Sequence, residues 1–161
     1  MGEEEIHYCP RCGTLVIEVE RFGKTRPVCP NCEWIFFPDP KVAVAVLVEK
    51  EAKVLLVRRI NDPQKGYWSL PAGFLDAGED PIQAVQRECA EETGLSVQIT
   101  ALLTVLAGQE HPRGAHLLIV YKGSVLEGEL EAGDDADEAG WFFRSELPPL
   151  AFSTTQQILD L

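Results

Sequence analysis

The sequence predicts an α/β domain preceded by a small ribbon that is held together by cysteine side chains. Four of the five cysteines fall within the first 32 residues, in two pairs. The rest of the chain alternates valine-rich runs with one sharply delimited helical pattern, which is typical of a sheet covered by helices. We therefore expect two units, residues 1–37 for the ribbon and residues 41–161 for the α/β domain.

The chain is strongly acidic, with a formal net charge of −12 and a pI of about 4.6. Such a field repels phosphate backbones, so a nucleic-acid polymer is not expected as a partner. A small phosphorylated ligand is compatible with it, because divalent cations held by carboxylates reverse the local field. The N-terminus is acidic where a signal peptide is basic, and no stretch approaches the roughly 18 apolar residues of a membrane span. We expect a cytoplasmic protein without a membrane partner.

The two cysteine pairs, Cys9/Cys12 and Cys29/Cys32, both have CxxC spacing and are separated by residues 13–28. This arrangement is typical of a four-cysteine zinc site, in which each pair supplies two thiolates to one tetrahedral ion. A redox motif would need a thioredoxin-like helix, and two disulfides would suit an oxidising compartment. With four cysteine ligands no position is left for water, so the zinc is expected to be structural. His7 is a competing ligand by position, although an exposed histidine is the preferred interpretation.

Between the cysteine pairs, residues 15–20 and 25–28 are predicted to form a hairpin turned at residues 22–24. A segment of about 37 residues cannot stabilise itself by burying apolar surface, so the metal is expected to supply most of its folding free energy. The ribbon is expected to end at Pro38-Asp39-Pro40, because proline cannot extend a paired strand.

In the second unit, residues 42–48 and 53–57 are predicted to be central strands buried on both faces. Further strands are expected at residues 97–107, 117–125 and 140–143. Exposed loops are expected at residues 61–65 and 131–137. Residues 153–156 fit a capping box and are expected to begin a short closing helix.

The clearest helix lies between Asp80 and Gly94. Asp80 is a good N-cap, Pro81 suits the first helical position and Gln83 completes a capping box. Gly94 supplies the left-handed residue that ends a helix.

This helix is predicted to have an apolar face and, offset from it, an acidic face. At about 100° per residue, the apolar face carries Ile82, Val85 and Cys89, and it is expected to pack on the sheet. The acidic face carries Glu88, Glu91 and Glu92. Carboxylates at i and i+4 repel by about 0.2–0.5 kcal/mol, and only Arg87 offers a compensating pair. Three acids on one face are explained if hard divalent cations such as Mg²⁺ or Mn²⁺ lie between them.

The residues around this helix resemble the motif of the Nudix hydrolases. The matching positions are Gly73, Glu79, Arg87, Glu88, Glu91, Glu92 and Gly94, and the departure is Cys89, where the family has an aliphatic residue. The resemblance implies an α/β/α sandwich with a mixed sheet. It also implies metal-dependent cleavage of a phosphoanhydride bond in a nucleoside diphosphate joined to another group, and it makes a homodimer plausible.

The same resemblance implies roles for the motif residues. The Mg²⁺ or Mn²⁺ ligands would be Glu88, Glu91, Glu92 and the carbonyl of Gly73. Arg87 would orient the glutamates, and Glu79 would lie beside them or on an additional metal. The general base is left open between Glu88 and Glu91, with Glu138, expected in an acidic loop, as an outside candidate.

Other residues are candidates for contacting the substrate. Aromatic rings suited to base stacking flank the motif at Tyr67, Trp68 and Phe74. Arginines that could meet phosphates are Arg58, Arg59 and Arg113. Packing or simple solvation is the competing explanation for each of these side chains.

A ribbon directly before a Nudix domain is similar to the arrangement in NADH pyrophosphatases and in enzymes that act on ADP-ribose. The run that marks NADH preference is absent, since residues 108–114 read Gly-Gln-Glu-His-Pro-Arg-Gly, so ADP-ribose is favoured. The alternatives are a nucleoside triphosphate pyrophosphohydrolase and a non-enzymatic nucleotide sensor with the ribbon as an interaction module. The intact set of glutamates disfavours the sensor.

Overall fold

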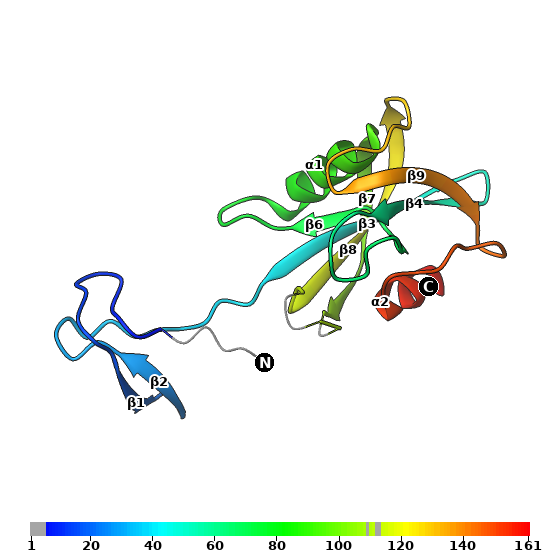
Figure 1. Cartoon of the computed structure of the whole chain (residues 1–161). Coiled ribbons are helices and arrows are strands. Elements are labelled where there is room, and N and C mark those ends of the chain that lie inside the picture. Colours follow the sequence, from blue (N-terminus) through cyan, green and yellow to red (C-terminus); the bar gives the residue numbers. More distant parts are fainter. Residues whose placement is uncertain (1–5, 109, 112–113) are drawn as a thin grey trace. The chain divides into compact units, whose positions relative to one another are not determined.

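The computed structural model describes residues 6–108, 110–111 and 114–161. The chain divides into two compact units, Met1–Asp39 and Pro40–Leu161. The first unit contains a β-hairpin, and the second contains a sheet with a helix on each face (Figure 1). Neither helix in the described part of the chain has the length and apolar character needed to cross a membrane.

The first unit is built from two similar knuckles joined by the hairpin β1 (Ile17–Arg21) and β2 (Lys24–Val28). In each knuckle a backbone N–H four residues after the first cysteine donates to that cysteine's carbonyl, from Gly13 to Cys9 and from Glu33 to Cys29. The two strands are antiparallel, with Arg21 opposite Lys24. The predicted ribbon is confirmed, with strands displaced by one or two residues.

The sheet of the second unit is mixed. Its strands are β3 (Val42–Lys50), β4 (Lys53–Arg59), β5 (Trp68–Ser69), β6 (Ala72–Phe74), β7 (Ser96–Ala107), β8 (Leu117–Glu127) and β9 (Ala136–Phe143). Their order is β5-β4-β3-β8-β7, with β6 pairing with β3 and β9 pairing with β4. The β3–β8 pair is parallel, whereas the other pairs between these strands are antiparallel.

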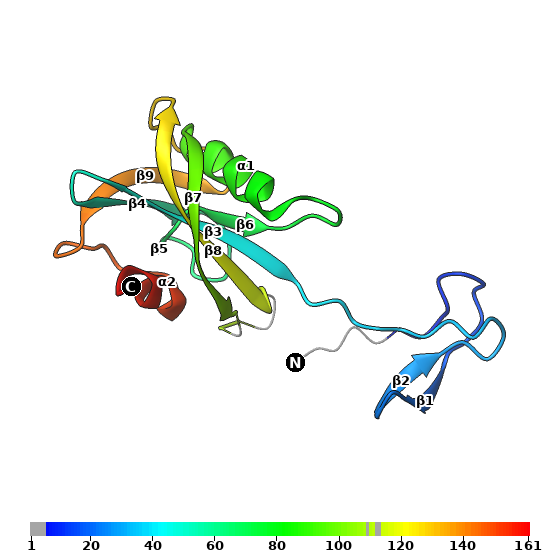
Figure 2. The ribbon, with the colours of Figure 1, turned by 180° about the vertical axis from the view of Figure 1, so that it is seen from behind.

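Helices α1 (Pro81–Thr93) and α2 (Ser153–Leu159) cover opposite faces of this sheet (Figures 1 and 2). Alternate residues of β3 point to the two faces, as the pleat requires. Val44 and Val46 join a core with Val85 of α1, whereas Ala45 joins a second core with Ile158 of α2. The prediction that β3 and β4 are buried on both sides is confirmed, and with it the α/β/α sandwich.

Several local expectations were wrong. The loop predicted at residues 131–137 is shorter, because β9 begins at Ala136, and the short strands β5 and β6 were not expected. Ile82 does not pack on the sheet; it is 43% exposed, and the buried face of α1 begins at Ala84. Helix α2 has Phe152 as its N-cap without a side-chain capping bond, so Ser153 is not the cap.

Candidate functional site

Residues next to α1 in the sequence determine where this helix begins and ends. The Asp80 side chain accepts hydrogen bonds from the backbone N–H groups of Ile82 at 2.9 Å and Gln83 at 3.2 Å. At the other end Gly94 has a φ of 70° and donates its N–H to the carbonyl of Ala90. These caps satisfy backbone groups that a helix otherwise leaves unpaired, so the predicted helix forms with the predicted ends.

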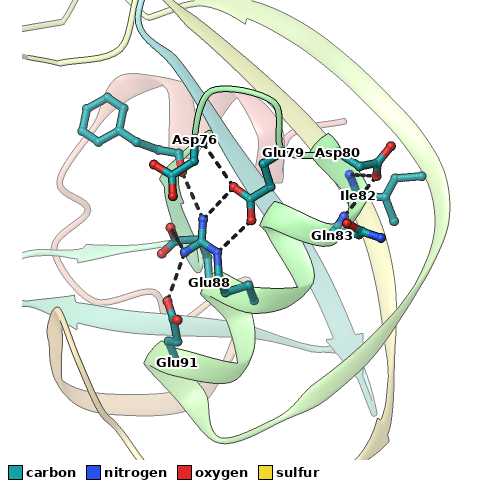
Figure 3. A network of polar contacts seen from close by, with 9 residues as sticks. Asp76, Glu79, Asp80, Ile82, Gln83, Glu88 and Glu91 are labelled. Atoms are coloured by element: carbon teal, nitrogen blue, oxygen red, sulfur yellow. Dashed lines mark hydrogen bonds and ion pairs between the residues drawn. The ribbon is translucent and has the colours of Figure 1, made fainter.

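Arg87 is the centre of the acidic site. Its Nε and Nη2 donate to the two oxygens of Glu79 at 2.9 and 3.0 Å. Its Nη1 donates to Glu88 at 2.7 Å and to Glu91 at 3.1 Å. Figure 3 shows Glu79 from the loop before α1, and Glu88 and Glu91 from α1, directed toward this common centre. The bond to Arg87 lowers the pKa of Glu79, as expected for a bidentate charged pair.

The carboxylate of Glu88 lies directly against Gly73. A Cβ at position 73 would overlap that carboxylate, so glycine is required for this close approach. Strand β6 places Gly73 there by pairing it with Val44 of β3. The Glu88 side chain is 12% exposed. Burial raises its pKa, an effect larger than the opposing bond from Arg87.

Glu92 is more deeply buried than the other glutamates, at 5% exposure, and accepts a hydrogen bond from the N–H of Ala72 at 2.9 Å. Burial raises its pKa to about 8, and the negative charges of Glu88 and Asp135 contribute in the same direction. The expectation of a separate acidic face is therefore wrong for Glu92, which lies on the buried stripe with Cys89. Its carboxylate reaches the sheet edge instead of solvent.

The donor set fits a hard divalent cation, although the carboxylates do not form a compact cage. Within the described residues, the one group of three or more metal-binding side chains with ligand atoms within 4.8 Å of one another is formed by the four cysteines. Arg87 occupies the space between Glu88 and Glu91. Glu88 is nevertheless partly buried and Glu92 is buried, and the charged forms of the two carboxylates disfavour each other. A cation beside them would reduce that repulsion.

The sulfur atoms of the ribbon are suitably arranged for zinc. The separations are 3.4 Å for Cys12 and Cys29, 3.6 Å for Cys9 and Cys32, and 3.7 Å for Cys12 and Cys32. Zn–S bonds of about 2.3 Å in a tetrahedron give sulfur separations of roughly 3.8 Å, whereas a disulfide requires about 2.05 Å. His7 is exposed and is not part of this group.

A cavity of about 230 Å³ opens beside Gly73, on the face of the sheet that α2 covers. Its walls come from β3, β6, α2 and the segments 108, 110–111 and 114–115, and small side chains such as Ala43, Ala45 and Ala72 leave the space. Phe74 borders it and is 50% exposed. The cavity thus lies next to the glycine that contacts Glu88.

Arg59 is a positively charged residue in the wall of this cavity. Its guanidinium lies 5.0 Å from the centre of the Phe152 ring, and its Nε donates to the carbonyl of Pro63 at 3.0 Å. Burial lowers its pKa, while the negative charges of Glu92 and Asp135 act to raise it, and no carboxylate in the described part of the chain lies within ion-pair distance of it. An unpaired, half-buried cation facing a cavity is a suitable contact for an anionic ligand.

Neighbouring Arg58 differs from Arg59. It forms ion pairs with Asp137 at 2.8 Å and with Glu138 at 2.7 Å. Glu138 is therefore not in a loop, as expected from the sequence, but within β9 directly opposite Arg58 of β4. Cross-strand pairing with an arginine explains its position.

The remaining sequence candidates lie elsewhere. Trp68 is 7% exposed and packs edge-on against Phe142 with ring centres 4.8 Å apart. Tyr67 is 44% exposed and does not line the cavity. Arg113 lies outside the residues that the structure describes.

One residue of the cavity wall was not predicted from the sequence. Glu110 lines the cavity and accepts the N–H groups of Ser153 at 2.8 Å and Thr154 at 2.7 Å, so it caps α2 from a distant loop. Burial acts to raise its pKa, but these hydrogen bonds outweigh burial and lower it. No local sequence pattern indicates a helix cap that lies 43 residues away along the chain.

Comparison with known proteins adds four findings to this geometry. The family model described as the NUDIX domain matches residues 39–160. An ADP-ribose pyrophosphatase of Methanocaldococcus jannaschii is 46% identical over 122 residues, which cover 75% of this chain and 72% of that protein. An NAD-capped RNA hydrolase, NudC, of Pseudomonas aeruginosa is 31% identical over 96% of this chain but only 54% of its own length.

Among solved structures, a Nudix hydrolase from Nitrosomonas europaea superposes with a TM-score of 0.84 at 32% identity. It covers 96% of this chain and 88% of that one.

Proposed function

This chain belongs to the NUDIX domain family of pyrophosphohydrolases, and from that premise we propose that it cleaves the phosphoanhydride of a nucleoside diphosphate joined to another group, with ADP-ribose as the preferred substrate. The observation that carries the proposal is the close approach of the Glu88 carboxylate to Gly73, a residue that also lines the cavity. Gly73 would thus connect the proposed carboxylate ligands, on the α1 side of the sheet, with a space on the α2 side that can hold part of a nucleotide.

We assign the catalytic Mg²⁺ or Mn²⁺ to Glu88, Glu91, Glu92 and the carbonyl of Gly73. Such a cation lowers the pKa of bound water and neutralises charge on the phosphates. Glu91 is the ligand freest to turn toward it, because its side chain is 44% exposed and its single bond to Arg87 is 3.1 Å long. Glu88 or Glu91 would accept the proton of the attacking water. Glu138, held by Arg58, is not proposed for this role.

Arg87 and Glu79 act as positioning residues in this proposal. The two-pronged bond from Arg87 to Glu79 anchors the guanidinium to the loop before α1. The remaining nitrogen of Arg87 then orients Glu88. Because an arginine in this position stays charged at every relevant pH, it holds the glutamates together before a cation arrives.

The cavity is proposed to hold one half of the substrate. Its volume of about 230 Å³ is below the roughly 300–1,000 Å³ of sites that enclose a whole ligand. We place a phosphate against Arg59 and a ring against Phe74, which has an exposed face that Trp68 lacks. The second half of the substrate would extend past the cavity border.

The two units are proposed to have separate roles, with a structural zinc ribbon in residues 1–37 and the hydrolase in residues 41–161. We further propose a homodimer in the cytoplasm. A reducing compartment keeps the four cysteines available as thiolates for zinc.

The test is a substrate panel with product identification in Mg²⁺ and in Mn²⁺. The panel contains ADP-ribose, NADH, NAD-capped RNA and nucleoside triphosphates. We expect the highest kcat/KM for ADP-ribose, with AMP and ribose phosphate as products. Release of inorganic pyrophosphate from a triphosphate at a higher kcat/KM would identify a triphosphate pyrophosphohydrolase instead. Tight nucleotide binding without turnover would identify a sensor.

A further inference from the structure

We propose that one face of the ribbon hairpin binds single-stranded RNA. The pairing of β1 with β2 sorts the charged residues onto two faces. Arg21 is opposite Lys24, and Val19 is opposite Arg26, so the three cations share one face. Glu18 and Glu20 belong to the other face by the same alternation. The hairpin is therefore locally positive on one side, although the whole chain has a net charge of −12.

The three cations are available for a ligand. No carboxylate in the described part of the chain forms an ion pair with Arg21, Lys24 or Arg26. Arg26 donates its Nε to the carbonyl of Arg21 at 3.3 Å, and its guanidinium lies 4.6 Å from the centre of the Phe37 ring. These contacts hold the guanidinium in place beside an aromatic surface.

Aromatic side chains are exposed next to these cations. Phe22 is 76% exposed and Phe37 is 47% exposed, with ring centres 6.1 Å apart. Exposed rings beside unpaired cations match a chain of phosphates and unpaired bases, because the cations meet the phosphates and the bases stack on the rings. Stacking on the rings requires unpaired bases, which favours a single strand over a duplex. RNA is the nucleic acid in which unpaired bases are common.

Phe22 combines high exposure with a strained backbone conformation. The two-residue turn has φ values of 52° at Phe22 and 73° at Gly23, the signs of a type I′ turn, in which asparagine before glycine is favoured. A bulky residue with positive φ is strained there. A strained and solvent-exposed phenylalanine therefore indicates a role in binding.

The experiment is a fluorescence anisotropy titration of the zinc-loaded full chain with labelled single-stranded oligouridine, without Mg²⁺ or Mn²⁺ so that the RNA is not cleaved. With three phosphate contacts, the slope of log K against log salt should be about −2. Lys24→Gln should reduce the slope by about 0.7. Arg11→Gln, a cation outside the hairpin, and Glu18→Gln, on the opposite face, should leave the slope unchanged.

The decisive variant is Phe22→Asn. We expect it to retain stoichiometric zinc and to bind oligouridine about tenfold more weakly, the loss typical of one stacked base. Undiminished affinity in Phe22→Asn and Phe22→Ala would overturn the proposal. Equal binding of inorganic polyphosphate or oligoglutamate would overturn it as well, since stacking would then contribute nothing. An equal loss in Arg11→Gln would contradict a specific hairpin face.

Discussion

The ribbon and the acidic end of α1 both collect groups that repel one another when charged, but they do so in different ways. In the ribbon, four sulfur ligands lie within 4.8 Å of one another. At α1, Arg87 stands between Glu88 and Glu91 and bonds to both. The first arrangement has the closed four-ligand set that is typical of a structural zinc site. The second holds its carboxylates on Arg87 and does not form a closed cage, which is what our proposal of an exchangeable catalytic cation expects.

The largest expected effect comes from breaking the closed site. Cys29→Ser should abolish stoichiometric zinc binding and unfold the ribbon, because the metal contributes roughly 10–16 kcal/mol in small zinc domains. Zinc content and the amide NMR spectrum of residues 6–39 measure this. Cys89→Ala, which removes the buried cysteine of α1, is the matched control and should keep full zinc. Retention of one zinc per chain in Cys29→Ser would rule out four-thiolate binding.

Removing a ligand from the open site should affect catalysis and not folding. Glu91→Gln is expected to lower kcat for ADP-ribose by roughly 10²–10³-fold, the usual cost of losing one electrostatic contact to the transition state. The thermal midpoint should change little, because Glu91 is 44% exposed. Glu138→Gln is the control, since that carboxylate pairs with Arg58, and it should keep nearly full activity. Equal turnover in wild type and Glu91→Gln would show that the ligand assignment is wrong.

The contact between Gly73 and Glu88 allows a finer test. In Gly73→Ala the new methyl group would occupy the position of the Glu88 carboxylate, and displacement by about 1 Å can cost roughly 10²-fold in rate. Stability should fall only slightly, since the end of a flexible side chain moves. Gly140→Ala is expected to show the opposite combination of effects. Its Cβ would lie 2.9 Å from the Phe142 ring, so this variant should lose about 1–3 kcal/mol of stability and keep its kcat. Steady-state kinetics and urea unfolding of both variants separate the two effects.

The smallest expected effect concerns two adjacent arginines. Arg59→Met should raise the KM for ADP-ribose about tenfold, because a hydrogen bond to a charged group contributes about 1.5–3 kcal/mol. Arg58→Met should change KM by less than about threefold, since surface ion pairs contribute roughly 0–1 kcal/mol. Comparable KM values for both variants would place the phosphate away from Arg59.

Much of this structure could be predicted because its signals are local. The CxxC spacing and the Asp80 and Gly94 caps act over a few residues, and both the ribbon and α1 are found where they were expected. The features that were missed depend on contacts between distant segments. The two- and three-residue strands β5 and β6 exist through their pairing with β4 and β3, and α2 is capped by Glu110 from another loop.

In the candidate site, too, the features with local signals were predictable and those that depend on distant segments were not. The sequence indicated which glutamates lie on α1, but the burial of Glu92 depends on the sheet edge at Ala72, which helical periodicity does not contain. The difference between Arg58 and Arg59 likewise depends on β9, which supplies Asp137 and Glu138 to Arg58 alone.

The most direct test of the open site is a Mn²⁺ titration of the zinc-loaded chain, followed by electron paramagnetic resonance of the free ion. Mn²⁺ prefers oxygen ligands and should not displace zinc from the thiolates. We predict saturable Mn²⁺ binding in the wild type and an affinity at least about tenfold weaker in Glu88→Gln, which loses a charged ligand. An unchanged Mn²⁺ affinity in both Glu88→Gln and Glu91→Gln would contradict the assignment of this cluster as the metal site.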